Sequence, residues 1–309
     1  MNTDPFRADV LDGLSYPQKS LPSRWLYDAE GSRLFDRITE LPEYYPTRTE
    51  LKILRSRASE MASAIGPQSV VIEYGAGSLL KVRILLDALD RPEAFVPVDI
   101  SASHLHTAAD ELKADYPKLQ IHPVAADFMA SNLGEALPQA AGRRAGFFPG
   151  STVGNLLDAD ILRFLSNARS DLGDGSCFIV GLDQPKSPDV LLPAYDDAQG
   201  VTAAFNLNLL KRINRELGGN FDLDAFAHEA RWNAAESRIE MHLRSLKPQS
   251  ATVAGERFRF AEGETIHTEN SRKIGLDAFG ELAEKAGWRL DRTWMDDDNL
   301  FAVMMLEAV

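Results

Sequence analysis

Three short polar motifs each follow a predicted strand, and together they offer the chemistry of a nucleoside site. Glu73-Tyr74-Gly75-Ala76-Gly77-Ser78 follows the first of these strands, Asp99 ends the second, and Asp127-Phe128 follows the third. Glycines let the backbone turn sharply and approach a ligand closely. A carboxylate at the end of the second strand can accept hydrogen bonds from both ribose hydroxyls. A carboxylate beside an aromatic ring suits the amino group and the stacking face of adenine.

Each motif also has a structural explanation. A GxG sequence is typical of any tight strand-to-helix turn, Asp99 suits a helix N-cap, and Asp127-Phe128 could be a loop acid beside a core ring. The complete dinucleotide motif GxGxxG is absent because Leu80 stands at its last position, which disfavours a pyrophosphate ligand. Because the three motifs stand at the ends of three successive predicted strands, together they favour an adenosyl ligand without pyrophosphate, such as S-adenosylmethionine.

An alternation of strands and helices predicts the framework that positions these motifs. Thr47 to Glu50 form a capping-box pattern, T-x-x-E, at the start of the first long helix. Strands that alternate with helices imply a parallel sheet with right-handed crossovers, and two closing strands add an antiparallel edge. Strands are predicted at 69–73, 95–99, 119–124, 146–149, 177–183, 288–295 and 301–306. Helices are predicted at 47–64, 79–89, 161–172 and 276–286, and a further helix follows the strand at 95–99 and ends at 112.

The pattern changes between residues 184 and 273. Two helical stretches, 188–197 and 201–217, precede alternating segments at 238–246 and 251–260 that are typical of antiparallel strands. This segment predicts a second domain, formed together with the N-terminal segment. The expected domains are a cofactor-binding core at 48–185 and 274–309 and a substrate-binding domain at 1–47 and 186–273, with the active site between them.

The charge balance excludes several classes of partner. The 309 residues include 33 Lys and Arg against 46 Asp and Glu, a net charge of -13. Because basic residues are not clustered, neither nucleic-acid phosphates nor an anionic membrane surface is an expected partner. No run of 18 apolar residues and no apolar N-terminal segment occurs, so neither a transmembrane helix nor a signal peptide is expected. We expect a cytoplasmic monomer that acts on a small molecule.

The histidines and the cysteine give no sign of a metal site. His104 and His106 are two residues apart and would not share a helix face, and the other four histidines show no ligand spacing. Cys177 stands alone in an apolar strand, where a buried structural thiol is expected. We therefore expect no metal. The chain also lacks GxSxG and a P-loop.

Motifs along most of the chain indicate a family. Pro149-Gly150-Ser151-Thr152-Val153-Gly154-Asn155 and His267-Thr268-Glu269-Asn270-Ser271 resemble motifs of the L-histidine Nα-methyltransferases of ergothioneine biosynthesis. The resemblance extends from about Arg24 to Ala302, so it includes the predicted second domain. Further motifs that carry it lie at 27–32, 41–48, 202–208 and 239–242.

The resemblance implies both a fold and a reaction. The fold is an α/β, Rossmann-like class I methyltransferase core, with a mostly parallel sheet and an antiparallel edge strand, plus a second α+β substrate-binding domain. The reaction transfers methyl groups from S-adenosylmethionine to the α-amino nitrogen of L-histidine. Three successive transfers give hercynine, the trimethyl betaine, and release S-adenosylhomocysteine each time.

The resemblance also assigns roles by position in the matching motifs. Asn155 and Tyr195 would hold the substrate carboxylate, and Glu269 and Ser271 would bind the imidazole. Tyr44 would be the catalytic residue near the amine, where a hydroxyl can accept a proton or a hydrogen bond without carrying a full negative charge. Met241 would line the substrate pocket, and the cofactor would be held by Tyr27, Gly75, Lys81, Asp99, Asp127 and Phe128.

Two other functions stay open. One is N-methylation of another aromatic amino acid or amine, and the other is a non-catalytic sensor that binds S-adenosylmethionine or histidine. The pair Glu269 and Ser271 favours histidine, because an indole would not need two opposed polar contacts. Tyr44, present beside the complete cofactor set, favours an enzyme.

Overall fold

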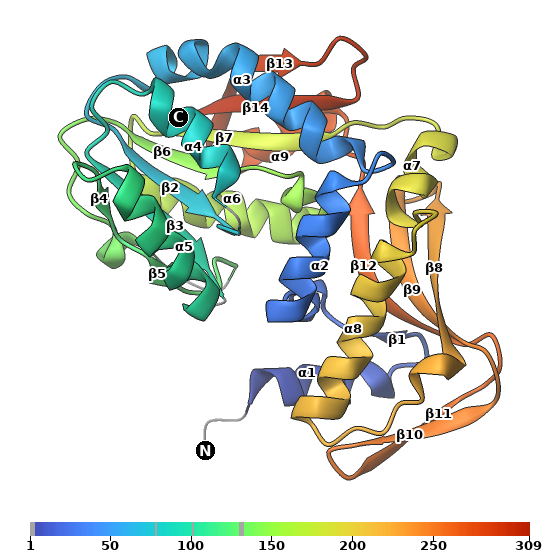
Figure 1. The fold of residues 1–309 in the computed structure, drawn as a ribbon. Coiled ribbons are helices and arrows are strands. Elements are labelled where there is room, and N and C mark those ends of the chain that lie inside the picture. Colours follow the sequence, from blue (N-terminus) through green and yellow to red (C-terminus); the bar gives the residue numbers. More distant parts are fainter. Residues whose placement is uncertain (1–3, 78, 101, 130–132) are drawn as a thin grey trace. The chain divides into compact units, whose positions relative to one another are not determined.

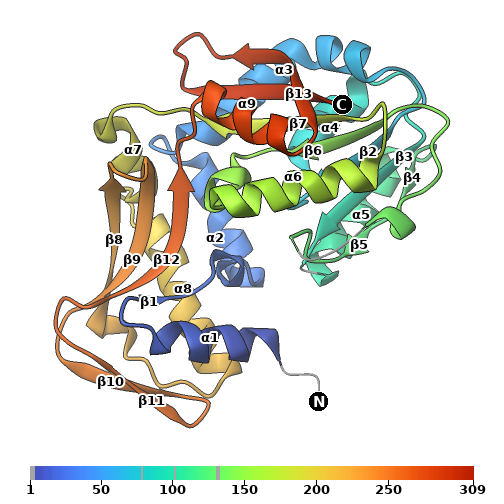
Figure 2. The same ribbon diagram turned by 180° about the vertical axis from the view of Figure 1, so that it is seen from behind.

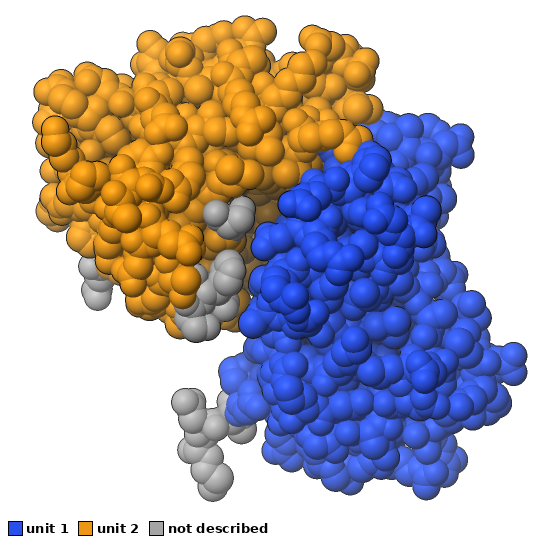
Figure 3. All heavy atoms as spheres, viewed as in Figure 1, with its two compact units in different colours: residues 1–45, 186–272 blue, residues 46–185, 273–309 orange. Residues whose placement is uncertain are grey.

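The computed structural model describes residues 4–77, 79–100, 102–129 and 133–309, and the chain forms two compact units, distinguished by colour in Figure 3. Unit 1 comprises Met1–Tyr45 and Lys186–Arg272, and unit 2 comprises Pro46–Pro185 and Lys273–Val309. The predicted domain boundaries fall within two residues of these divisions, and the roles given to the two domains stay predictions. Among the described residues, no helix is long and apolar enough to cross a membrane.

Unit 2 is built on a mostly parallel sheet with the strand order β13-β14-β7-β6-β2-β3-β4, with β5 also paired to β3 (Figure 1). β14 runs antiparallel to both β7 and β13 at one edge, which confirms the expected α/β core with an antiparallel edge. The expected strand at 119–124 is instead two short strands, β4 and β5. The strands are β2 (Val70–Tyr74), β3 (Ala94–Asp99), β4 (Gln120–Ile121), β5 (Val124–Ala125), β6 (Arg144–Phe148), β7 (Cys177–Asp183), β13 (Trp288–Met295) and β14 (Phe301–Ala308).

Helices cover both faces of this sheet (Figures 1 and 2). Side chains of a strand point alternately to its two faces, so Ile72 of β2 enters one core and Val71 enters the other. The Ile72 core includes side chains of α6 (Asp158–Leu172) and α9 (Leu276–Lys285). The Val71 core includes side chains of α3 (Tyr45–Ile65), α4 (Leu80–Ala88) and α5 (Ala102–Asp115).

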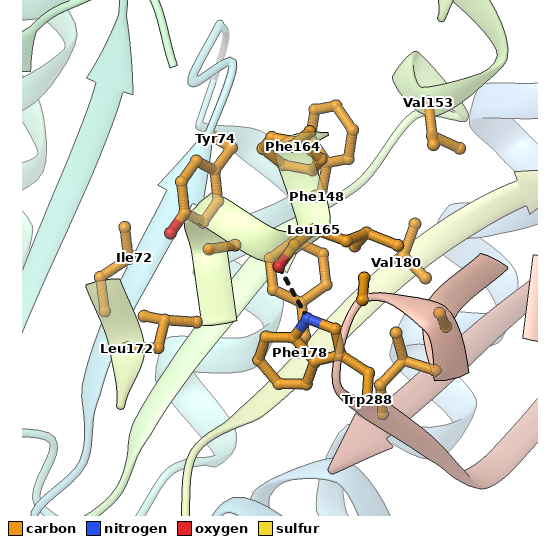
Figure 4. Close-up of a cluster of buried hydrophobic side chains, with 14 of the residues drawn as sticks. Ile72, Tyr74, Phe148, Val153, Phe164, Leu165, Leu172, Phe178, Val180 and Trp288 are labelled. Atoms are coloured by element: carbon orange, nitrogen blue, oxygen red, sulfur yellow. Dashed lines mark hydrogen bonds between the residues drawn. The ribbon is translucent and has the colours of Figure 1, made fainter. Parts of the chain in front are cut away.

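Aromatic rings fill the centre of the Ile72 core (Figure 4). Trp288 is fully buried, and its Nε1–H donates to the Leu165 carbonyl at 2.9 Å, as the dashed line in Figure 4 shows. Phe178 lies so close to Gly146 that a Cβ on this glycine would be 2.3 Å from the ring. Cys177 on the opposite side of β7 is buried, as expected, and burial raises its pKa to about 12.

The start of α3 differs from the sequence prediction. The helix begins at Tyr45, two residues before Thr47, so the capping box predicted from Thr47 and Glu50 is wrong. Tertiary contacts decide the role of Glu50 instead, because its carboxylate is fully buried in unit 2 and bonded there.

Unit 1 contains the four-stranded sheet β1-β12-β9-β8, and α7 and α8 pack on β8 and β9. The predicted strand at 251–260 is wrong: it is the hairpin β10-β11, with Ala254 and Gly255 at positive φ in its turn. The elements are α1 (Pro5–Ser15), β1 (Lys19–Ser20), η1 (Ser23–Leu26), α2 (Ala29–Glu40), α7 (Pro188–Tyr195), α8 (Val201–Glu216), η4 (Leu223–Ala225), β8 (Phe226–Asn233), β9 (Arg238–Ser245), β10 (Gln249–Val253), β11 (Glu256–Phe260) and β12 (Thr265–Arg272).

Candidate functional site

The three polar motifs meet at the carboxyl ends of neighbouring strands in unit 2. Gly75 follows β2 with a φ of 71°, and its N–H donates to the carbonyl of Val98 in β3 at 2.9 Å. Asp99 pairs with Ala125 of β5, so Asp127 follows directly beyond that pair. The Phe128 ring lies near Gly75, since a Cβ there would be 3.7 Å from the ring. Ser78 of the glycine motif lies outside the described residues.

Lys81 forms an ion pair with the buried carboxylate of Glu50 in the same unit. The Lys81 Nζ lies 2.6 Å from Glu50 Oε2, and the side chain of Glu50 is 1% exposed. The N–H of Gly150 donates to both Glu50 oxygens at 2.9 Å. The carboxylate therefore connects α3, α4 and the loop after β6, and Glu50 is a residue that the sequence analysis did not place in the site.

Glu73 adds a second buried carboxyl group near this pair. Its Oε2 has no hydrogen-bond partner among the described atoms. Burial raises the pKa of Glu73 to about 8, opposed by Lys81 and reinforced by Glu50 and Asp99. Burying a polar group without a partner is costly, so this position favours a ligand that supplies a donor or a positive charge.

The residues of this region fit S-adenosylmethionine. The sulfonium and the ammonium of this molecule are cationic, and carboxyl groups of Glu73, Asp99 and Asp127 stand at the strand ends. The left-handed backbone of Gly75 and the open space around the Cβ position of Gly77 allow a close approach to the main chain. Ring contacts hold Phe128 in place, at 5.5 Å from Phe148 and 5.4 Å from Phe164 between ring centroids.

Asn155 ends η3 (Thr152–Asn155), the short helix after β6. A hydrogen bond from the Asp183 N–H to Ser151 Oγ, at 2.9 Å, fixes the start of this helix. The Asp183 carboxylate pairs in turn with Lys273 at 2.7 Å, and both side chains are at most 1% exposed. Asn155 thus stands on a segment that is hydrogen-bonded to the end of β7, at the residue whose side chain forms this buried ion pair. It lies in unit 2, whereas the other residues predicted to bind the substrate lie in unit 1.

An aromatic cluster in unit 1 contains three of the predicted site residues. Ring centroids of Phe35 lie 5.5 Å from Tyr27 and 6.2 Å from Tyr44, and Tyr44 lies 6.1 Å from Tyr195. Tyr44 and Tyr195 are each 8% exposed. The structure groups Tyr27 with residues predicted to bind the substrate, and its contact with the cofactor stays a prediction.

The remaining predicted substrate residues share one face of the unit 1 sheet. Glu269 of β12 pairs with Met241 of β9, and Ser271 pairs with the next residue of that face, Ile239. The hydroxyl groups of Ser271 and Tyr195 lie 2.6 Å apart, so α7 meets the sheet at this point. A β-bulge at Thr268 sets this register.

The sequence of both units matches one family model. Residues 6–308 match the family described as histidine-specific, S-adenosylmethionine-dependent methyltransferases. The chain belongs to this family. The family resemblance expected from the sequence is therefore confirmed.

Relatives and a solved structure agree with this assignment. This methyltransferase is 46% identical to the histidine N-alpha-methyltransferase of Mycolicibacterium smegmatis, over 98% of this chain and 94% of the relative. It is 32% identical to ergothioneine biosynthesis protein 1 of Neurospora crassa, over 65% of this chain and 23% of that longer protein. It superposes on an S-adenosylmethionine-dependent methyltransferase from Clostridium acetobutylicum with a TM-score of 0.54 at 11% identity, covering 89% and 98% of the two chains. That likeness concerns the fold.

The methyltransferase also holds Tyr195 through residues that the sequence analysis missed. His228 of β8 donates from Nε2 to the Tyr195 carbonyl at 2.8 Å, and its Nδ1 accepts from Asn206 at 2.9 Å. Asn206 of α8 also donates to the His242 carbonyl of β9 at 3.1 Å. Burial lowers the pKa of His228, which keeps the ring neutral in this role. The sequence did single out Asn206, because this residue belongs to the family motif at 202–208.

A second asparagine of that motif links it to the family motif at 27–32 in the methyltransferase. Asn208 donates to the Asp28 carboxylate at 2.8 Å, and Arg215 pairs with the same carboxylate at 2.7 Å. Although burial raises the pKa of Asp28, these hydrogen bonds and the Gly31 N–H lower it overall. The motifs at 27–32 and 202–208 therefore meet where α2 and α8 lie side by side (Figures 1 and 2).

Proposed function

We propose that this methyltransferase converts L-histidine to hercynine by three successive methyl transfers to the α-amino nitrogen, as a step of ergothioneine biosynthesis in the cytoplasm. The observation that carries the proposal is the match of both units, residues 6–308, to a histidine-specific family. The relatives named histidine N-alpha-methyltransferase and ergothioneine biosynthesis protein 1 support the substrate and the pathway. The protein is proposed to act as a monomer.

The methyl donor supplies an electrophilic carbon on a sulfonium, a good leaving group, so the chain itself has little covalent chemistry to perform. Its residues must bind and align the reactants, and alignment can contribute about 7–11 kcal/mol to lowering the barrier. We assign Asp99 to the ribose, Asp127 and Phe128 to the adenine, and Gly75 and Lys81 to the methionine end, with Tyr27 alongside. The chemistry requires no metal.

Histidine recognition is assigned to the face of β12 and β9 that carries Glu269, Ser271 and Met241. Glu269 accepts a hydrogen bond from the imidazole N–H, and Ser271 donates a hydrogen bond to the other ring nitrogen. Tyr195, whose hydroxyl lies 2.6 Å from that of Ser271, is assigned with Asn155 to the carboxylate. This closeness suits histidine, whose carboxylate and ring are separated by only two carbon atoms. Other amino acids would leave these polar groups unpaired, which gives discrimination.

The attacking amine must lose its proton, because an ammonium has no lone pair. A site that stabilised the ammonium strongly would slow the first transfer. Tyr44 is assigned to the amine because its hydroxyl accepts a hydrogen bond without a full negative charge. The Tyr44 ring makes edge contacts with the rings of Phe35 and Tyr195, at centroid distances of 6.2 and 6.1 Å.

Mass spectrometry after incubation with S-adenosylmethionine and an amino-acid mixture tests the proposal. Gain of three methyl groups by histidine alone is the expected result. Methylation of another aromatic amino acid or amine instead would select the second function, and binding without turnover would select a sensor.

Calorimetry on Glu269→Ala tests the imidazole contact. Histidine affinity should fall at least tenfold while the affinity for S-adenosylmethionine changes little. Glu262→Ala, an exposed glutamate of the same unit, is the matched control and should bind both ligands as the wild type does. Equal losses for both ligands in Glu269→Ala would remove Glu269 from the imidazole site.

A further inference from the structure

A cluster of three potential metal ligands lies on the unit 1 sheet, on the face opposite Met241 and Glu269. Glu240, His242 and His267 each offer one ligand atom, and these atoms lie within 4.8 Å of one another. The sequence analysis found no ligand spacing among the histidines, because this group comes together only through the pairing of two strands. Residues two apart on a strand share a face, and the third ligand comes from the adjacent strand, where His267 pairs with His242.

The hydrogen bonds of the cluster leave lone pairs available. Glu240 Oε1 accepts from Arg238 at 2.8 Å and from Asn233 at 2.9 Å, while Oε2 lies 3.2 Å from His242 Nε2. Among the described residues, His242 Nδ1 and Asn270 Oδ1 are buried and have no hydrogen-bond partner. Asn270 lies directly across from Glu240 in the sheet. Buried polar atoms normally find partners, so a species that supplies a partner to Asn270 Oδ1 is expected here, whereas His242 Nδ1 is not the ring nitrogen next to Glu240.

The donor atoms suit a cation, because imidazole nitrogen and carboxylate oxygen are ligands of divalent transition metals. Arg238 contacts Oε1, which leaves Oε2 directed at the histidines.

The geometry needs only a local adjustment to close around an ion. Ligands at about 2.1 Å from a tetrahedral ion lie roughly 3.4 Å apart. Glu240 Oε2 and His242 Nε2 already satisfy this separation, at 3.2 Å. The rings of His242 and His267 are stacked with centroids 4.8 Å apart and planes 16° from parallel, so rotation of the His267 ring must bring its nitrogen inward.

We propose that Glu240, His242 and His267 bind a divalent transition-metal ion, with the Asn270 carbonyl oxygen or water completing its coordination. Two imidazoles and a carboxylate favour Zn²⁺, Co²⁺ or Ni²⁺ over Mg²⁺ and Ca²⁺, which prefer oxygen ligands alone. The site would join β9 to β12, the two strands that carry Met241, Glu269 and Ser271 on their other face. The ion has no role in methyl transfer, and its binding does not depend on the proposed function.

Calorimetric titration with Zn²⁺ tests the site. The full chain is used without a histidine tag, after treatment with a chelator, and in the absence of free histidine, which itself binds Zn²⁺. One equivalent should bind, and His267→Leu should weaken binding at least tenfold. His122→Leu, which removes an exposed histidine of unit 2, is the matched control and should bind as the wild type does. No stoichiometric binding, or the same affinity in His267→Leu, would overturn the proposal.

X-ray absorption of the Zn²⁺-loaded wild type provides a test that does not depend on the folding of a variant. Two imidazole ligands with oxygen in the remaining positions are expected. A spectrum with no imidazole ligand, with one, or with sulfur would contradict the assignment, as would loss of binding in His122→Leu.

Discussion

The Glu50 carboxylate occupies the space where Gly181 has no side chain: a Cβ on Gly181 would lie 2.2 Å from Glu50 Oε1. Gly181 is in the middle of β7, so a central strand of the sheet leaves room for a charged group from α3. That group holds Lys81, which is predicted to bind the cofactor, and the N–H of Gly150, which belongs to the family motif that ends at Asn155. The absence of a side chain at Gly181 thereby allows the carboxylate of Glu50 to occupy its position.

Gly181→Ala should displace this carboxylate and weaken S-adenosylmethionine binding about tenfold or more, because hydrogen bonds to charged groups contribute about 1.5–3 kcal/mol. Calorimetry measures the change. Glu50→Gln should produce a loss of the same kind. Gly280→Ala is the control, since the Cβ position of Gly280 in α9 is open and the substitution should leave affinity unchanged. Wild-type affinity in both Gly181→Ala and Glu50→Gln would refute the role of Glu50.

Glu73 should make the stability of the protein fall as the pH rises. Its pKa is raised to about 8 in the folded state, so between about pH 4.5 and 8 the folded state holds a proton that the unfolded state has lost. The contribution is complete below the unfolded pKa and disappears as the pH passes through 8. Denaturant unfolding of Glu73→Gln at several pH values should show a smaller decline from about pH 5 to 9 than in the wild type. Parallel curves for the two proteins would contradict the raised pKa.

Lys273→Met should lower the free energy of unfolding by about 3–5 kcal/mol, because it leaves the carboxylate of Asp183 buried without its cation. Urea unfolding measures the loss. Replacing both partners, Lys273→Met with Asp183→Leu, should recover most of it. Lys247→Met, which removes an exposed pair with Asp222, should change stability by less than about 1 kcal/mol. A loss in Lys273→Met no larger than in Lys247→Met would mean that the buried pair is not required.

His228 is predicted to position Tyr195 for substrate binding. His228→Leu removes the donor to the Tyr195 carbonyl and should raise KM for histidine about tenfold. The S-adenosylmethionine Kd should stay the same. His228→Gln retains an N–H near the position of Nε2 and should restore most of the affinity. If His228→Leu weakened both ligands equally and His228→Gln gave no rescue, the residue would be a general stability determinant.

Asp99→Ala should raise the Kd of S-adenosylmethionine and leave histidine binding little changed, because Asp99 ends β3 beside the glycine turn. Direct binding measurements on both ligands test this. Asp174→Ala, an almost fully exposed aspartate of the same unit, serves as the comparison. An unchanged Kd in Asp99→Ala would remove this carboxylate from the ribose site.

The parallel core was predictable because its strands are continuous apolar runs. All seven residues of β7 are buried, and all five of β2 are buried, so hydrophobicity alone marks them. β12 is different, since Thr265–Arg272 carries polar residues on both faces and lacks that signal. Its strand character depends on pairing with β9 and β1, which local sequence does not encode.

The candidate site was predictable in part for a similar reason. Motifs at strand ends, such as Gly75 and Asp99, depend on local order along the chain and could be placed from it. The role of Glu50 requires knowledge of which strand lies beneath α3, and the role of His228 requires the contact between β8 and α7. The cluster of Glu240, His242 and His267 depends on the pairing register of two strands. Nothing in the spacing of single residues reveals such relationships.

The bulge at Thr268 has a consequence for how this family can vary. His267 and Glu269 are two residues apart and would share a face in a regular strand, but the extra residue sends them to opposite sides of β12. One strand therefore presents two chemically separate surfaces, so substitutions on one can accumulate without altering the other. Deleting Thr268 would make His267 and Glu269 adjacent in a regular strand and would leave them on opposite faces. A deletion at another position inside β12 would instead exchange the faces on one side of it, so a deletion should be tolerated better at Thr268 than elsewhere in the strand.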